Sequence, residues 1–293
     1  MLRALVATIL AVACAGPAGA AAAPDIAVGP QYDTAHVYVA PADMDRFAAA
    51  FVASFGGQAA KPAMLTVTPT PSSTRWQAIQ TPVGSVSLFG FVTPIPYPFG
   101  AERTGYLIKD MATAVAAAKA AGADVVVAPF PDPIGQDAII QWPGGVEMQL
   151  YVHNVAPSAP ALRTVPENRV YVSPERADAF IGAFVRFSGG AVTADDPHAP
   201  GAEIGRSGEV FREIRIGSGF GKLTVLVTDG HLPFPYGRET TGYEVSNLSE
   251  TLANATAAGA VVLAGPYRSR GRDAAVVQFP GGPIAEIHAS AAP

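Results

Sequence analysis

The fold of this chain is decided by ten residues near the middle of the sequence, WPGGVEMQLY at 142–151. A Pro-Gly-Gly turn leads into a run in which apolar and polar side chains alternate, which is typical of a tight turn followed by a half-buried β-strand. The same arrangement returns 137 residues later, as FPGGPIAEIH at 279–288. The chain therefore contains an internal repeat.

Two further pairs of segments extend the repeat over most of the sequence. VYVAP at 37–41 matches VYVSP at 170–174, and PYPFGAERTGY at 96–106 matches PFPYGRETTGY at 233–243. These pairs predict two homologous modules, residues 33–153 and 165–290. The Pro- and Ala-rich residues 154–164 between them have no amphipathic period and are interpreted as a linker.

Each module is predicted to contain two βαβββ units. Phe47, Phe51 and Phe55 follow one another at helical spacing within 43–55, and Asp110 and Gly122 have the residue types of a helix N-cap and C-cap. Strands of the first module are expected at 35–39, 62–68, 75–80, 84–92, 106–108, 124–127, 137–142 and 146–151. The expected fold is α+β, with two tandem half-open barrels that bury Phe47, Phe51, Phe180 and Phe184 under their sheets.

The net charge of the chain limits the classes of binding partner that are expected. The 293 residues are 49% hydrophobic and carry a net charge of −5 with only 19 Lys and Arg. Nucleic acid and anionic membrane surfaces need clustered positive charge, so neither is an expected partner.

The first 23 residues are interpreted as a signal peptide. Arg3, an apolar run over 4–13 and small residues at 18–23 have the required order. Cleavage before about Asp25 would export the protein to the periplasm or the extracellular space and remove Cys14, its only cysteine. A lipid anchor on Cys14 is the alternative. No later run approaches the ~20 apolar residues of a membrane-spanning helix.

The helix and strand order, together with the Pro-Gly-Gly turn before the last strand, resembles the vicinal oxygen chelate superfamily. This superfamily comprises glyoxalases, bleomycin-resistance proteins and extradiol dioxygenases. The resemblance implies a barrel around a metal held by side chains of the first, fifth and last strands. It places Thr34, Arg103 and Gln149 at these positions in the first module, which resembles a metal-free copy.

In the second module the corresponding positions are Glu167, Thr240 and Glu286. Glu167 and Glu286 would hold Mn²⁺, Mg²⁺ or Ca²⁺, since these ions prefer oxygen ligands. The alternative is that the two carboxylates pair with Arg169 and Arg215. The missing histidines argue against an iron dioxygenase.

Four residues of the second module are candidates for catalysis. Glu286 and His288 should share one strand face, with His288 as acid or base. Glu239 and Tyr243 belong to the segment at 233–243, whose aromatic residues and those of its first copy would line a cavity mouth. The structural alternative is a rigid Pro- and Gly-containing turn. In the first module, His36 is a candidate base whose repeat partner is Arg169.

Three functions remain open. One is a secreted lyase or isomerase of glyoxalase type that acts on a small oxygenated substrate. The second is a non-catalytic protein that sequesters a small molecule, as bleomycin-resistance proteins do. The third is a structural or envelope interaction protein built from degenerate barrels. Metal analysis of the purified protein would separate the first from the others.

Overall fold

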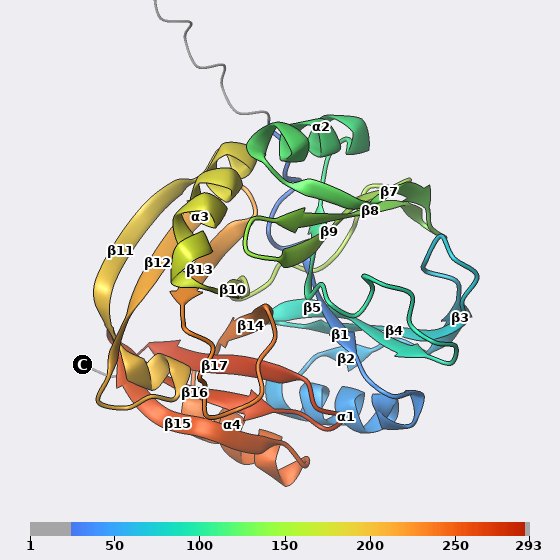
Figure 1. Ribbon diagram of the computed structural model, residues 1–293. Coiled ribbons are helices and arrows are strands. Elements are labelled where there is room, and N and C mark those ends of the chain that lie inside the picture. Colours follow the sequence, from blue (N-terminus) through green and yellow to red (C-terminus); the bar gives the residue numbers. More distant parts are fainter. Residues whose placement is uncertain (1–24, 291–293) are drawn as a thin grey trace, which may run out of the picture.

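The computed structural model of the protein describes residues 25–290 (Figure 1). The expected signal peptide at 1–23, Cys14 included, lies outside the described residues. Within 25–290, no helix is both long and apolar enough to cross a membrane.

The first module contains nine strands and two α-helices, with one 3-10 turn at Pro41–Asp43. Its elements are β1 (Thr34–Tyr38), α1 (Met44–Phe55), β2 (Gln58–Ala59), β3 (Ala63–Leu65), β4 (Thr74–Thr81), β5 (Gly84–Phe91), β6 (Thr104–Leu107), α2 (Met111–Ala121), β7 (Asp124–Pro131), β8 (Gly135–Trp142) and β9 (Val146–His153).

The second module contains eight strands and two α-helices, with one 3-10 turn at Gly201–Ile204. Its elements are β10 (Glu167–Val172), α3 (Pro174–Ser188), β11 (Ala191–Pro200), β12 (Val210–Ser218), β13 (Gly221–Val227), β14 (Glu239–Glu244), α4 (Leu248–Ala257), β15 (Val261–Ser269), β16 (Arg272–Gln278) and β17 (Ile284–Ser290).

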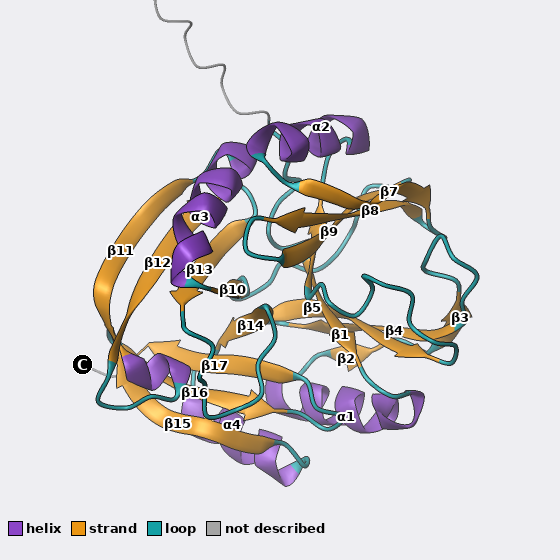
Figure 2. Cartoon of the chain, in the orientation of Figure 1, coloured by secondary structure: helices purple, strands orange, loops and turns teal. Residues whose placement is uncertain are grey.

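Each module forms its own curled, mixed sheet (Figure 2). The strand orders are β2-β4-β5-β1-β6-β9-β8-β7 and β11-β12-β13-β10-β14-β17-β16-β15. In each sheet two βαβββ units meet along one antiparallel pair, β1 with β6 and β10 with β14. The predicted pair of half-open barrels is confirmed.

The strand expected at 62–68 is the main local difference. Two short strands, β2 and β3, pair one after the other along the same edge of β4, and Pro62 lies in the gap between them. Proline has no backbone N–H to donate to a ladder, so the strand is interrupted there. The first sheet therefore counts nine strands instead of eight.

The helices join the two modules. α1 packs against α4, and α2 packs against α3, so each helix contacts a helix of the other module (Figure 1). The Phe51 ring lies 5.4 Å from Tyr243 and 5.5 Å from Phe279, both of the second module. The Phe184 ring lies 6.0 Å from Trp142 of the first. The four phenylalanines expected in the core are buried, and their partners include rings of the other module.

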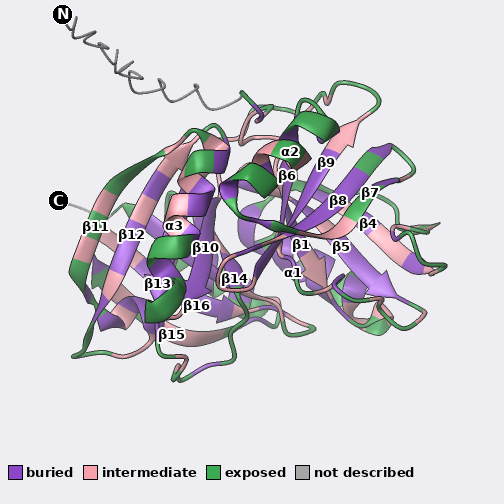
Figure 3. Cartoon of the chain, turned by 45° about the horizontal axis from the view of Figure 1, so that its top comes forward, coloured by how far each residue is buried: buried purple, intermediate pink, exposed green. Residues whose placement is uncertain are grey.

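The opposite face of each sheet encloses the barrel interior. Phe89, Phe99 and Ile139 pack there in the first module, and Tyr171, Phe211 and Leu226 in the second. Figure 3 shows that central strands such as β10 are buried along their length, whereas the edge strand β11 is largely exposed.

Candidate functional site

Strand register decides which residues face one another across the middle of each barrel. Thr34 of β1 pairs with Gly105 of β6, and Gly105 pairs with Gln149 of β9. In the second module the same row is Glu167, Gly242 and Glu286. The fifth-strand position is therefore a glycine in both modules, two residues after Arg103 and Thr240, and those two assignments are corrected.

The space above each glycine is taken by a side chain of the first strand. A Cβ placed on Gly105 would lie 2.5 Å from His36 Nε2, and one on Gly242 would lie 2.9 Å from Glu286 Oε2 and 3.1 Å from Arg169 Cδ. No third ligand can come from this position of the fifth strand, because glycine has no side chain.

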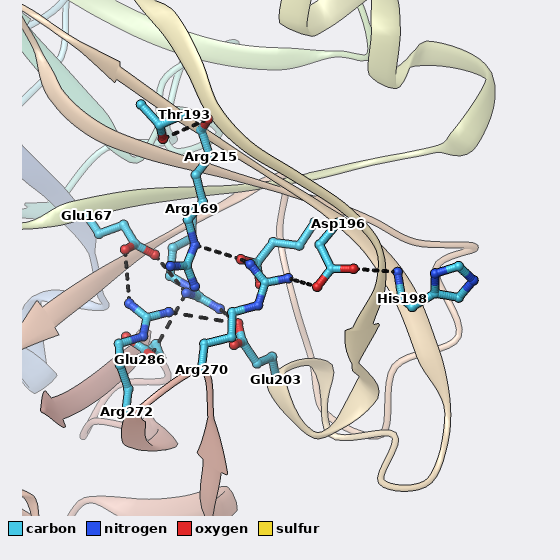
Figure 4. A network of polar contacts seen from close by, with 11 residues as sticks. Glu167, Arg169, Thr193, Asp196, His198, Glu203, Arg215, Arg270, Arg272 and Glu286 are labelled. Carbon is cyan, nitrogen blue, oxygen red and sulfur yellow. Dashed lines mark hydrogen bonds and ion pairs between the residues drawn. The ribbon is translucent and has the colours of Figure 1, made fainter. Parts of the chain in front are cut away.

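Glu167 and Glu286 do face the same interior, and a guanidinium lies between them (Figure 4). Arg169 Nη1 is 2.8 Å from Glu167 Oε1 and 3.9 Å from Glu286 Oε1, and the Arg169 side chain is 1% exposed. Arg169 Nη2 is 3.5 Å from Glu203 Oε2. The buried Arg169 guanidinium is thus a cation shared by three buried carboxylates.

The network continues toward the open edge of the second barrel (Figure 4). Arg272 Nη1 lies 3.2 Å from Glu167 Oε2, and Glu213 is paired at 2.8 Å with both Arg215 and Arg270. The pairing with Arg169 that the sequence offered as an alternative is present, whereas Arg215 pairs with Glu213 instead.

The pKa of Glu167 agrees with its pairing to Arg169 and Arg272. Burial alone would raise the pKa of Glu167, but the charges of Arg169 and Arg272 outweigh it and lower the pKa to about 2. Burial and the neighbouring Glu203 raise the pKa of Glu213 to about 7. The carboxylate that bonds directly to Arg169 is therefore held ionised by protein cations.

These residues do not fit a divalent cation. The Arg169 guanidinium takes the place between Glu167 and Glu286 where an ion would bind, and its charge would repel that ion. In the corresponding row of strand positions the first module offers the Thr34 hydroxyl and the Gln149 amide, with the His36 imidazole over Gly105. Among residues 25–290, no group of three His, Cys, Asp or Glu side chains is arranged to hold a metal.

The first barrel contains a cavity of about 330 Å³. Aromatic rings make up much of its wall, namely Tyr32, Tyr38, Trp76, Phe89, Phe99 and Tyr151. Polar groups reach it from β1, β5, β8 and β9, namely Thr34, His36, Ser85, Ser87, Asp137 and Gln149. Pro157, Ser158 and Ala159 of the segment between the modules also line it.

His36, Tyr38 and Glu102 form a polar group at the wall of this cavity. The Tyr38 hydroxyl donates to Glu102 Oε1, and His36 Nδ1 lies 3.5 Å from the same oxygen. His36 and Glu102 are almost completely buried, and the Tyr38 ring stacks on Phe89 at 4.9 Å. An imidazole beside a buried carboxylate is an arrangement that can accept and return a proton.

The four catalytic candidates of the second module divide between two places. His288 Nδ1 is 2.7 Å from Glu286 Oε2 inside the barrel, as the shared strand face predicted. Tyr243 packs against Phe51 and Phe55 in the core between the modules. Glu239 and Tyr243 line a second cavity, also of about 330 Å³, between the modules. The structure does not bring these two residues to Glu286.

Glu239 is buried among residues of both modules. Burial raises its pKa to about 8, against the Thr104 hydroxyl and the charge of Arg103, which lower it. The aromatic residues of its segment and of the first copy at 96–106 do not share one cavity mouth: Phe99 lines the first barrel, Tyr236 lines the cavity between the modules, and Tyr97 is 75% exposed.

Solved structures with the same arrangement identify the fold. A variant of 4-hydroxymandelate synthase from Streptomyces coelicolor superposes with a TM-score of 0.60 at 14% identity, over 90% of this chain and 94% of that one. The chain has the vicinal oxygen chelate fold. No protein-family model and no curated protein sequence matches it.

Two further structures of the vicinal oxygen chelate fold are similar over most of the chain. A 2,2',3-trihydroxybiphenyl 1,2-dioxygenase from Sphingomonas wittichii has a TM-score of 0.55 at 12% identity, over 89% of this chain and 90% of that one. A Mn(II)-bound glyoxalase from Novosphingobium aromaticivorans has a TM-score of 0.52 at 13% identity, over 88% and 81%. At these identities the likeness concerns the fold.

Sequence reasoning placed the candidate site in the second module, whereas the cavity of about 330 Å³ inside a barrel lies in the first. Glu167 and Glu286 indicated that module because they are carboxylates at two of the three ligand positions implied by the resemblance. The sequence signal for this difference between the barrels is the pair His36 and Arg169, an imidazole and a guanidinium at the same repeat position.

Proposed function

We propose that this protein binds a small molecule without a metal, and that the ligand occupies the barrel interior of the first module. The observation that carries this proposal is the contrast between the two barrels. The first encloses about 330 Å³ lined by aromatic rings and a few polar groups, while the second holds the Arg169 network. Ligand sites in proteins have this lining and begin at about 300 Å³.

A filling substitution tests the proposal. Ser87 lies on β5, on the face that lines the cavity, and its small side chain leaves room for a ring. Small aromatic compounds screened by saturation-transfer NMR should bind the wild-type chain, and Ser87→Phe should weaken their binding at least about tenfold. Ser207→Phe, on an exposed turn of the second module, is the control. Equal binding to Ser87→Phe and wild type would refute the location.

A second candidate function is a metal-independent lyase or isomerase that acts on a small oxygenated substrate. The contact of His36 with Glu102 at the cavity wall favours it. Such an enzyme would exchange a substrate proton with solvent, so incubation of sugars and hydroxy acids in heavy water should show deuterium uptake by NMR. His36→Gln should abolish the uptake while ligands still bind; uptake that persists in His36→Gln would exclude this role.

Export of the protein is part of the proposal. Arg3, the apolar run that follows and the small residues at 18–23 support it. Mass spectrometry of protein recovered from the periplasm or medium should find an N-terminus between about residues 20 and 25. An intact Met1 would contradict export, and a lipid on Cys14 would indicate an anchored protein.

A further inference from the structure

The carboxylates in the wall of the first-barrel cavity have no lysine or arginine beside them, and the basic residues of that wall are His36 and His153. Asp132 and Asp137 line the cavity, and no lysine or arginine is among the lining residues. Arg103 is the nearest candidate for a compensating cation, but its guanidinium lies over the Tyr38 ring, 5.5 Å from the centroid, and donates to Gly100 O.

Asp137 is the buried acid of this wall. It lies on β8, in alternation with Ile139 of the barrel interior, and its side chain is 6% exposed. Within residues 25–290, no basic side chain forms an ion pair with it, in contrast to the arginine-paired acids of the second barrel. A buried carboxyl without a cation is costly to ionise unless a bound group supplies the opposite charge.

The rings of the same cavity suit a cation. Trp76, Tyr38 and Phe89 line the same space as Asp137, and the Tyr38 ring already has a guanidinium, that of Arg103, 5.5 Å from its centroid. The face of an aromatic ring attracts an ammonium group, and the attraction grows when both are removed from water. An anion would instead meet the negative faces of the rings and two aspartates.

We infer that the first-module cavity selects an organic cation, a small molecule with an ammonium group on an apolar or aromatic body. This inference rests on the proposed function and specifies its ligand class. The ammonium group lies against Asp137 and the Trp76 ring, and the apolar body contacts Phe89. Burial is the main cause that raises the pKa of Asp137; the charges of Asp132 and Glu102 add to it, and a hydrogen bond with Gln149 opposes it. A cation bound beside Asp137 would favour the ionised carboxylate.

A charge series of similar size tests the ligand class on the full chain. Benzyltrimethylammonium, benzyl alcohol and phenylacetate carry a positive, zero and negative charge on one phenyl group. Titration calorimetry at a pH of about 8, where histidine is ordinarily neutral, should give the tightest binding for the ammonium compound, by at least about tenfold over the alcohol. Phenylacetate should not bind measurably.

Asp137→Asn keeps the shape of the side chain and removes its charge. It should weaken the ammonium compound about tenfold and leave benzyl alcohol within about threefold, which also shows that the cavity is intact. Asp124→Asn, on the exposed start of β7, is the matched control and should change neither. Trp76→Leu should weaken the ammonium compound more than the alcohol, because it removes the π-face.

The outcomes separate the two proposals. If the alcohol or phenylacetate binds as tightly as the ammonium compound, and Ser87→Phe blocks that binding, the ligand site stands and the cation inference is overturned. Ammonium binding that Asp137→Asn leaves unchanged also overturns it. If none of the three probes binds, the cation inference fails, and the broader compound screen decides on the site.

Discussion

His36 and Arg169 hold the same position in the duplicated sequence, and each covers the glycine at the fifth-strand position of its barrel. In the first module the covering group is an imidazole beside Glu102, and the cavity remains open. In the second it is a guanidinium among three buried carboxylates. One exchange of residue type accompanies the difference between a barrel with space and a barrel filled by ion pairs.

Arg169→Met should destabilise the protein by about 3–5 kcal/mol, because it leaves buried carboxylates without their shared cation. Urea unfolding measures the change. Arg46→Met, which removes an exposed arginine paired with Asp43, should cost at most about 1 kcal/mol. A loss at Arg169 as small as that at Arg46 would show that the second barrel does not depend on this cation.

Removal of metal should leave the thermal midpoint unchanged. Only a species that binds the folded state raises the midpoint, and the Arg169 guanidinium competes for the place between Glu167 and Glu286. The midpoint in a chelator should therefore equal that with added Mn²⁺, Mg²⁺ or Ca²⁺. Glu286→Ala should lower it equally in both buffers, since it breaks the contact with His288. A shift seen only with the ion would restore the metal-site hypothesis.

Phe279→Ala should destabilise both modules together by about 3–5 kcal/mol. Its ring packs on Phe47 and Phe51 of the first module, at 5.8 and 5.5 Å. Both tryptophans of the chain, Trp76 and Trp142, belong to the first module, so their fluorescence reports its unfolding. The fluorescence midpoint should fall as far as the circular-dichroism midpoint; an unchanged fluorescence midpoint would mean that the modules unfold independently.

Because Glu239 is buried, the free energy of unfolding should fall as the pH rises. Its pKa is about 8 in the folded protein and lies near 4.5 when exposed, so the folded state binds more protons between these values. The contribution is full below about pH 4.5 and is lost by about 1.4 kcal/mol per pH unit up to about pH 8. Denaturant titrations of wild type and Glu239→Gln should diverge accordingly, and parallel curves would contradict the shift.

The repeat made the fold predictable, because two copies of one pattern fix the order of strands and helices. Asp110 accepts from Thr113 N at 2.8 Å and Gly122 has φ 100°, as the capping residues indicated. Strand register was not predictable. Thr240 lies opposite Arg169 and Arg103 opposite His36, two residues away from the row of Glu167 and Thr34. A shift of two residues keeps the same face and leaves the hydrophobic pattern unchanged.

Whether a barrel encloses a cavity or is filled by ion pairs could also not be predicted from residues that are neighbours in the sequence. Glu203, Glu213, Arg270 and Arg272 are far from Arg169 in the sequence, and only the curling of β12 and β16 around β10 brings their charges together. Which barrel is open depends on these long-range pairs. Residue types at single positions therefore pointed to the module with the more reactive groups, and not to the one with space.

The segment Pro157–Ala159 connects the two modules and is also part of the wall of the first cavity. A duplicated gene has an unusual freedom at such a joint, because residues can be inserted or deleted there without disturbing either copy's strands. In this protein a change at these residues would also reshape the cavity of the first barrel. The junction between the copies is thus a place where the shape of that cavity can change while both barrels keep their sequences.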